Sequence, residues 1–219
     1  MQQFLKATAF LFITAQLSVA VTTTTLTYRE TTGKTVRTSA TVITQTDDST
    51  IVESKSPVFT IRHVLEKNYQ SRSWHAQSTE DKFEMTARKD GADIVASGTL
   101  KNKPISKRTK PEKKIWYQEL TMPLGAWARV GEKTTKFWMV MVFNGELFEF
   151  AAHNDGATNV VVDGTSTDCI HVRMTLAGAM AILWKGDYFF RTSDGRLIKY
   201  EGATRPGAQK MMYELIKEE

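Results

Sequence analysis

Apolar and polar residues alternate with a period of two along most of the chain, a pattern typical of half-buried β-strands. Lys82 to Arg88 shows it most clearly: Phe83, Met85 and Ala87 are predicted to face a core, and the residues between them to face water. Ile170 to Leu176 repeats the alternation. The pattern predicts a chain that is nearly all β.

Four Asn-Gly or Asp-Gly dipeptides separate apolar segments, at positions 90–91, 144–145, 163–164 and 194–195. Such dipeptides favour tight type I′ turns, and a series of hairpins implies an up-and-down meander instead of parallel βαβ units. The predicted fold class is all-β: a single curved antiparallel meander sheet, an unclosed or half β-barrel, with at most one or two short helices. The segment from Met122 to Trp127 is expected to form a loop or one helical turn, with at most one short helix near Met122 to Ala128, because Pro123 and Gly125 exclude a long one.

The apolar run from Phe137 to Phe143 is expected to lie at the centre of the fold. Asn144-Gly145 follows it directly, and Leu147 resumes the apolar pattern, which predicts a hairpin with a two-residue turn. Side chains on both faces of the first strand are apolar. We therefore expect this strand to be covered on both faces and not to lie at an edge of the sheet.

Residues 1–20 have the pattern of a secretory signal peptide. Lys6 precedes an apolar segment from Ala7 to Leu17, and Ser18-Val19-Ala20 matches a small-x-small cleavage site. The alternative, a membrane anchor, is disfavoured because the segment is shorter than the ~20 residues needed to span a bilayer. Residues 21–219 are then one antiparallel β-domain, periplasmic or secreted, without a transmembrane span, and the loss of Lys6 lowers its net charge from +5 to 5 − 1 = +4.

The only cysteine is Cys169, so no intrachain disulfide can form. Cys169 and His171 lie two apart on a predicted strand, where a thiol beside an imidazole suits a nucleophile pair or half of a metal site. A buried thiol beside a half-exposed histidine is the simpler interpretation, because a metal site needs more ligands. His63, His75 and His153 are scattered. We predict no catalytic residue, no metal and no cofactor, and hence a protein that is not an enzyme.

The segment Lys101–Lys114 is strongly basic, and Pro104 and Pro111 are expected to keep it irregular. One interpretation is contact with anionic lipid headgroups or an anionic envelope polymer; the simpler one is a solvated loop. Few aromatic residues accompany the charges, which argues against a nucleic-acid partner. The candidate surface-binding residues are Lys107, Arg108, Lys110, Lys113 and Lys114.

Large aromatic and methionine side chains exceed what a thin sandwich needs. In a curved sheet they either fill the core, which is the simpler interpretation, or line a cavity for an apolar guest. Methionine suits a cavity because it can repack around varied guests. The candidate ligand-binding residues are Trp116, Trp127, Trp138, Met139, Met141, Phe148, Phe150, Trp184 and Phe190.

The segment from Trp184 to Gly202, WKGDYFFRTSDGRLIKYEG, resembles the closing hairpin of a broad family of exported bacterial β proteins of unknown function. The Asp163-Gly164-Thr165 turn and the Cys-Ile-His-Val-Arg-Met strand after it resemble the preceding elements of that family, so the resemblance covers roughly Lys82 to Glu219. It implies a half-barrel similar to the outer-membrane lipoprotein carriers, which enclose acyl chains on their concave face. It carries over no catalytic residue.

Two functions follow as leading hypotheses. The first is a non-enzymatic periplasmic or secreted protein that binds a lipid or another hydrophobic ligand on the concave face of its sheet. The second is a structural or interaction module of the cell envelope that docks on an anionic surface through residues 101–114. An enzyme that uses Cys169 and His171 is the third hypothesis. A cavity on the concave face would favour the first.

Overall fold

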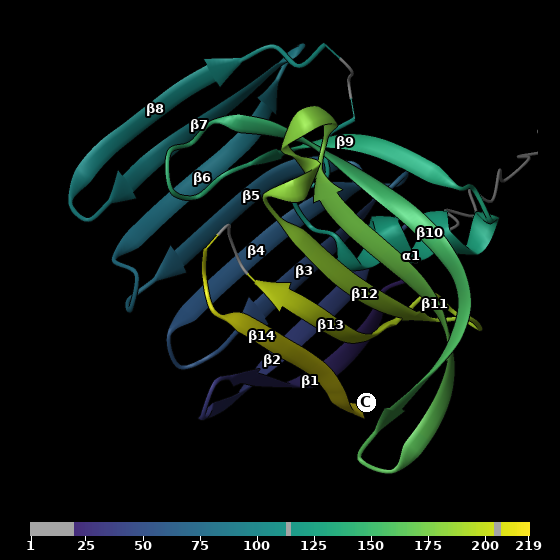
Figure 1. Cartoon of the computed structure of the whole chain (residues 1–219). Coiled ribbons are helices and arrows are strands. Elements are labelled where there is room, and N and C mark those ends of the chain that lie inside the picture. The colour runs from purple at the N-terminus through teal and green to yellow at the C-terminus, as the bar shows by residue number, and fades with distance from the viewer. Residues whose placement is uncertain (1–19, 113–114, 204–206) are drawn as a thin grey trace, which may run out of the picture.

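The computed structural model describes residues 20–112, 115–203 and 207–219, so the predicted leader, except for Ala20, lies outside the described residues. Within them, fourteen strands form one curved antiparallel sheet (Figure 1), which confirms the predicted fold class. The strands are β1 (Thr22–Thr32), β2 (Thr35–Gln45), β3 (Ser49–Lys55), β4 (Phe59–Glu66), β5 (Ser71–Ser78), β6 (Phe83–Asp90), β7 (Asp93–Leu100), β8 (Lys103–Thr109), β9 (Thr134–Val140), β10 (Leu147–Val162), β11 (Thr165–Leu176), β12 (Lys185–Arg191), β13 (Leu197–Ala203) and β14 (Lys210–Glu218).

The sheet consists of two meanders joined by its first and last strands. Strands β1 to β8 follow one another in sequence order on one side, and β14 to β9 follow in reverse order on the other. In the middle, β1 pairs with β14, with Arg29 opposite Glu214. The two edges of the sheet are β8 and β9, which do not pair with each other. The segment between them therefore spans the opening and carries the helix α1 (Thr121–Val130).

The predicted hairpins all occur, but only one of the four turns has the predicted form. Asp163 and Gly164 both have positive φ, 47° and 80°, between the paired residues Val162 and Thr165. At 90–91 the turn is shifted by one residue to Gly91-Ala92, because Asp90 pairs with Asp93. At 194–195, only Gly195 has positive φ, in a longer connection.

The predicted two-residue turn at Asn144-Gly145 is wrong. The Met141 N–H donates to the Glu146 carbonyl at 2.9 Å, so the loop spans the residues between them. Only Gly145 adopts a positive φ, 72°. Its backbone packs closely on β8, where a Cβ at this position would lie 2.6 Å from Ile105 Cγ2. The longer loop thus brings the end of the β9–β10 hairpin against the opposite edge of the sheet.

The prediction that the strand after Lys136 avoids the sheet edge is also wrong, since β9 is an edge strand. Its outer side is covered by a short segment, residues 115–118. The Trp138 N–H donates to the Ile115 carbonyl at 3.0 Å, and the Tyr117 N–H donates to the Trp138 carbonyl at 3.1 Å. The Gln118 side-chain oxygen accepts the Val140 N–H at 2.8 Å. A non-local segment therefore supplies the cover that a paired strand would give.

The basic segment at 101–114 is not irregular throughout, contrary to expectation. Residues Lys103–Thr109 form β8, the other edge strand. Pro104 lies opposite Thr99 there, and an edge strand tolerates proline because one side of its backbone needs no ladder partner. Lys113 and Lys114 lie outside the described residues.

The core lies inside the curve of the sheet and draws on both meanders. Leu26 and Val52 come from the N-terminal strands, and Phe137, Phe150 and Phe190 from the C-terminal ones; all are buried. Helix α1 packs into the same cluster (Figure 1), so the expected short helix is present and occupies the concave face. A second cluster joins the two edges and contains Trp74, Met85, Trp116 and Val140.

Candidate functional site

The concave face carries the candidate ligand-binding residues other than Trp138, but three of them are fully buried. Trp116, Phe150 and Phe190 are at most 3% exposed. The Phe150 ring contacts Phe137 at 6.2 Å between centroids and meets Trp184 edge-on at 5.7 Å. These rings pack on one another, as aromatic side chains in a core commonly do.

The other candidates lie half-buried at the border of this core. We call this set the apolar margin; it comes from α1, β9, β10 and the residues that flank β9 and β12. Its members pack on the central cluster with one part of each side chain and face solvent with the other. Met139 and Phe148 are cross-strand neighbours on β9 and β10. Neighbouring apolar side chains mark binding sites more often than scattered ones do. The apolar margin consists of the candidates Trp127, Met139, Met141, Phe148 and Trp184, together with Met122 of α1, which the sequence did not suggest as a candidate.

Trp138 is the one candidate that neither cluster includes. Its neighbours Phe137 and Met139 point to the concave face, so its own ring points to the other. The indole Nε1 is buried and has no hydrogen-bond partner among the described residues. It therefore does not join the apolar margin.

Helix α1 is longer than the short helical segment that the sequence predicts, because its two unfavourable residues occupy positions that tolerate them. Pro123 lies in the first turn, where a missing N–H costs no hydrogen bond. Gly125 allows close packing, since a Cβ there would lie 2.0 Å from the Gly195 carbonyl oxygen. Gly131 ends the helix with φ 84°. At its C-terminal end, the Asn154 amide donates to the Ala128 carbonyl at 3.1 Å.

A buried carboxylate caps the start of α1. Glu119 accepts the backbone N–H groups of Thr121 and Met122, each at 2.8 Å, and the Thr121 hydroxyl. Burial raises the pKa of the Glu119 carboxyl, while these hydrogen bonds oppose the rise. A carboxylate at a helix N-terminus also interacts favourably with the helix dipole. Glu119 was not predicted from the sequence, although an acidic residue just before Thr121 is a signal for a helix start.

The concave face is not apolar throughout, which the sequence pattern did not reveal. On β2 to β4, buried polar residues share the face of the core, since Ser39 lies opposite Tyr28 and His63 lies opposite Val52. The Ser39 hydroxyl is 2.8 Å from the Tyr213 hydroxyl. Burial lowers the pKa of His63 to about 3, and its Nδ1 has no hydrogen-bond partner among the described residues. His63 is therefore neutral in the folded protein at physiological pH.

The two best-defined pockets in the described part of the chain both lie away from the apolar margin. One, of about 240 Å³, lies between the tip of the β10–β11 hairpin and the C-terminal strands, with Val162, Ile198 and Leu215 among its lining residues. The other, of about 120 Å³, lies beside Pro111 and Trp116. Both are smaller than the ~300–1,000 Å³ typical of pockets for small-molecule ligands.

Cys169 and His171 share one face of β11, as expected, but each has other partners. Cys169 is fully buried among Val160, Val162 and Ile198, and burial raises the pKa of its thiol to about 11. The His171 Nε2 lies 2.9 Å from Asp187 Oδ1. A thiol with a raised pKa is a poor nucleophile. Across residues 20–112, 115–203 and 207–219, no three acidic, histidine or cysteine side chains gather closely enough to hold a metal ion.

The basic candidates on β8 are partly neutralised by neighbouring carboxylates. Arg108 binds Asp93 at 2.8 Å and also contacts Asp90. Lys107 lies 3.5 Å from Glu146 in the β9–β10 loop. Lys110, the remaining described candidate, is exposed. The positive field of this edge is therefore weaker than its sequence suggests.

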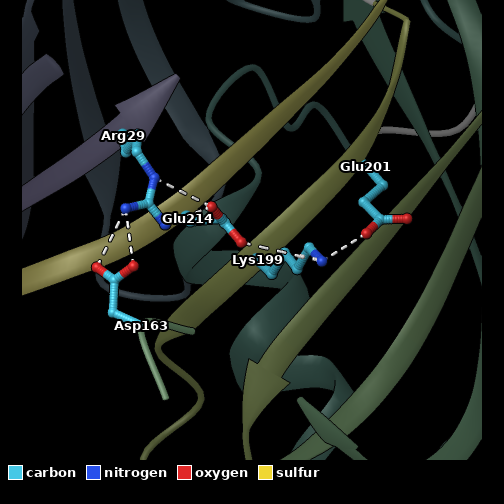
Figure 2. A network of polar contacts seen from close by, with 5 residues as sticks. All are labelled: Arg29, Asp163, Lys199, Glu201 and Glu214. Carbon is cyan, nitrogen blue, oxygen red and sulfur yellow. Dashed lines mark hydrogen bonds and ion pairs between the residues drawn. The ribbon is translucent and has the colours of Figure 1, made fainter. Parts of the chain in front are cut away.

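A network of charges fixes the tip of the β10–β11 hairpin to the centre of the sheet (Figure 2). Arg29 on β1 contacts Glu214 on β14 at 2.7 Å and Asp163, at the hairpin tip, at 2.8 Å. Lys199 on β13 contacts Glu201 at 2.6 Å and lies 3.9 Å from Glu214. The Glu214 side chain is only 8% exposed. It is therefore the buried centre of the network.

Replacement of Glu214 by glutamine is expected to lower the free energy of unfolding by about 2 kcal/mol, because Arg29 loses its buried counter-charge. The matched control is Glu201→Gln, in the same network but half-exposed. It is expected to cost less than about 0.5 kcal/mol. Urea unfolding measures both variants, and equal losses would show that Glu214 is not the centre of the network.

Comparisons with known proteins bear on the fold. The sequence matches no protein-family profile and no curated protein. The structure is similar to a beta-barrel-like protein of a domain of unknown function, DUF1849, from Brucella abortus, with a TM-score of 0.61 and 9% identity over 90% of this chain and 97% of that one. At this identity the likeness concerns the fold alone.

Two further solved structures align over most of the chain with low scores. A DUF1329 family protein from Desulfovibrio piger has a TM-score of 0.28 and 10% identity, over 92% of this chain and 86% of that one. A LolA superfamily protein from Nitrosomonas europaea has a TM-score of 0.23 and 8% identity, over 90% of this chain and 84% of that one. Neither score supports a conclusion. The resemblance read from the Trp184 to Gly202 hairpin is thus confirmed as a beta-barrel-like fold shared with a protein of unknown function.

Proposed function

We propose that this protein is a non-enzymatic protein of the bacterial envelope that binds an apolar ligand, such as a lipid acyl chain, on its concave face. The observation that carries the proposal is the apolar margin beside α1. Its half-buried rings and methionines pack on the same cluster as α1, whereas both pockets lie elsewhere. The predicted secretory leader at residues 1–20 supports the location in the envelope.

In the proposed mechanism, α1 occupies part of the ligand site and moves when the ligand binds. The helix has ten residues, including Pro123 and Gly125, and helices this short are marginal without tertiary contacts. Leu124 and Ala128 are its buried contacts with the core. An acyl chain that took their place would keep the surrounding rings covered. The exchange replaces one apolar contact by another, so it costs little free energy.

The test is displacement of a dansyl-labelled fatty acid from the purified chain by oleate, before and after α1 is fixed in place. Cysteines replace Arg129 and Asn154 in a Cys169→Ser background, and a short bis-maleimide joins them across the Asn154–Ala128 contact. The unlinked variant is expected to bind saturably. The linked protein is expected to bind at least roughly tenfold more weakly, because the helix can no longer leave the face.

The matched control is the same cross-link between cysteines at Thr86 and Ser97, which pair on β6 and β7. That link is expected to leave fatty-acid binding unchanged. Saturable binding that the α1 link does not weaken would show that the ligand lies elsewhere. Absence of saturable binding by the unlinked protein would reject the binding function itself.

The dense packing of the concave face favours a second candidate function, a structural or interaction module without a ligand. Phe137, Phe150 and Phe190 already fill the centre of the curve. In that case neither the dansyl probe nor oleate binds saturably, and mass spectrometry of protein purified from its native envelope detects no associated acyl lipid. The same experiments therefore separate the two candidates.

A further inference from the structure

The connection between β11 and β12 exposes large apolar side chains. It contains the 3-10 turn η1 (Gly178–Ile182) and Leu183. Ile182 is 92% exposed, Leu183 59% and Met180 41%. Gly178 adopts a positive φ of 66°, which turns the chain sharply at the start of η1. We call Met180, Ile182 and Leu183 the η1 wedge. Because Ile182 buries almost no surface, it contributes little to the stability of the fold.

The η1 wedge adjoins the open end of the concave face. Trp184 follows it directly and contacts Phe150 in the core, and the Ala177 N–H just before it donates to the Glu149 carbonyl on β10 at 2.9 Å. Figure 1 shows η1 as the short coil at the same end of the molecule as the β9–β10 hairpin. In the loop of that hairpin, Phe143 is 39% exposed, and its ring centroid lies 6.4 Å from that of Phe148.

Cationic side chains lie next to these apolar residues. Lys185 follows Trp184, is exposed, and makes no ion pair with the described residues. Lys107 on β8 is next to the β9–β10 loop, where its Cγ would lie 3.5 Å from a Cβ on Gly145. Its partner there, Glu146, balances that charge. The uncompensated charge beside the wedge is therefore Lys185, in a chain with an overall charge of +5.

We propose that the η1 wedge inserts into the headgroup region of an anionic phospholipid bilayer, with Lys185 at the level of the phosphates. Exposed aliphatic side chains, a tryptophan at their base and a flanking lysine are the residue types that the bilayer interface favours. A folded partner would need a groove to accept a projecting side chain. The two pockets described above lie elsewhere, and charged residues are among their lining, which disfavours a second copy of this chain as the partner.

This inference goes beyond the proposed ligand binding, because no residue of the η1 wedge belongs to the apolar margin. The two are nevertheless adjacent through Trp184. Docking by the wedge would place the open end of the concave face at the membrane surface, where an acyl ligand could enter without crossing water. Membrane docking and fatty-acid binding can be measured separately, so one can fail while the other holds.

The test is flotation of the full chain with vesicles of phosphatidylcholine containing phosphatidylglycerol, compared with vesicles of phosphatidylcholine alone. The wild type is expected to bind the anionic vesicles. The double variant Ile182→Ser, Leu183→Ser is expected to lose at least roughly tenfold in partition coefficient, because two aliphatic side chains no longer leave water. Lys185→Gln is expected to weaken binding to the anionic vesicles about fivefold.

The matched control is Val161→Ser, an apolar residue with the same exposed fraction as Leu183, three residues before Gly164 in the β10–β11 turn. Figure 1 shows the tip of this hairpin at the end of the molecule opposite η1. The Val161→Ser variant is expected to bind vesicles like the wild type, and the double variant is expected to retain the wild-type fatty-acid displacement and melting temperature. Equal binding to both vesicle types, or unchanged binding by the double variant, would overturn the proposal. So would a wild-type dimer that the double variant converts to a monomer while vesicle binding persists.

Discussion

Replacement of Trp116 by alanine is expected to lower the free energy of unfolding by about 3–5 kcal/mol, the range for large aromatic residues in cores. The Trp116 ring is fully buried, and its Nε1 donates to Gln118 Oε1 at 3.1 Å. Its carbonyl accepts the Ser71 N–H on β5 at 2.8 Å. The residue thus links the edge strand β9 to the opposite meander, and its loss leaves a cavity at the joint. Urea unfolding measures the change.

Trp127→Ala is the matched control for this prediction. Trp127 is half-buried on α1, and its Nε1 donates to Glu132 at 3.0 Å near the surface. Its replacement is expected to cost about 1 kcal/mol, because it removes less buried surface. Equal losses in the two variants would mean that the segment 115–118 does not hold the two edges of the sheet together.

A second large effect is expected from acid. Folded His63, with a pKa of about 3, binds no proton above that pH, whereas in the unfolded chain it takes one up near pH 6.5. The unfolded state therefore binds more protons throughout this window, so this residue makes the free energy of unfolding fall as the pH falls. The loss amounts to about 1.4 kcal/mol per pH unit below 6.5.

The His63→Leu variant is expected to lack this loss, so near pH 4.5 the wild type should have fallen by about 2–3 kcal/mol relative to it. Glu119, with its raised pKa, has the opposite pH dependence, but it is present in both proteins and cancels in the difference. Thr41→Val, a buried change on β2 that removes no titrating group, controls for lost polarity. Parallel pH dependence in the wild type and His63→Leu would show that His63 is not buried and neutral.

The strands were predictable from the sequence wherever the local pattern decides the structure. Met85 and Ala87 are buried and their neighbours Glu84 and Thr86 exposed, as their alternation predicts. Asp163-Gly164 forms the expected turn because both residues tolerate positive φ. In these places side-chain periodicity and turn chemistry agree, and tertiary contacts do not override them.

The remaining features depend on contacts between residues far apart in the sequence. By its intrinsic propensity Gly125 is a helix breaker, and only its close approach to Gly195 explains its place in α1. The aromatic strand β9 can lie at an edge only because Ile115 and Tyr117 bond to Trp138. Likewise, no local pattern indicates that β1 pairs with β14, which places Arg29 beside Glu214. On the concave face, the aromatic side chains were expected from the sequence. The buried roles of Glu119 and His63 and the exposed η1 wedge were not.

Hydrogen–deuterium exchange of the α1 amides, with and without saturating oleate, tests the central claim most directly. If an acyl chain takes the place of α1 on the concave face, the amides from Thr121 to Val130 are expected to exchange roughly tenfold faster or more with ligand, while those of β11 and β12 stay protected. Unchanged or slower exchange of the α1 amides in the saturated protein would contradict the account.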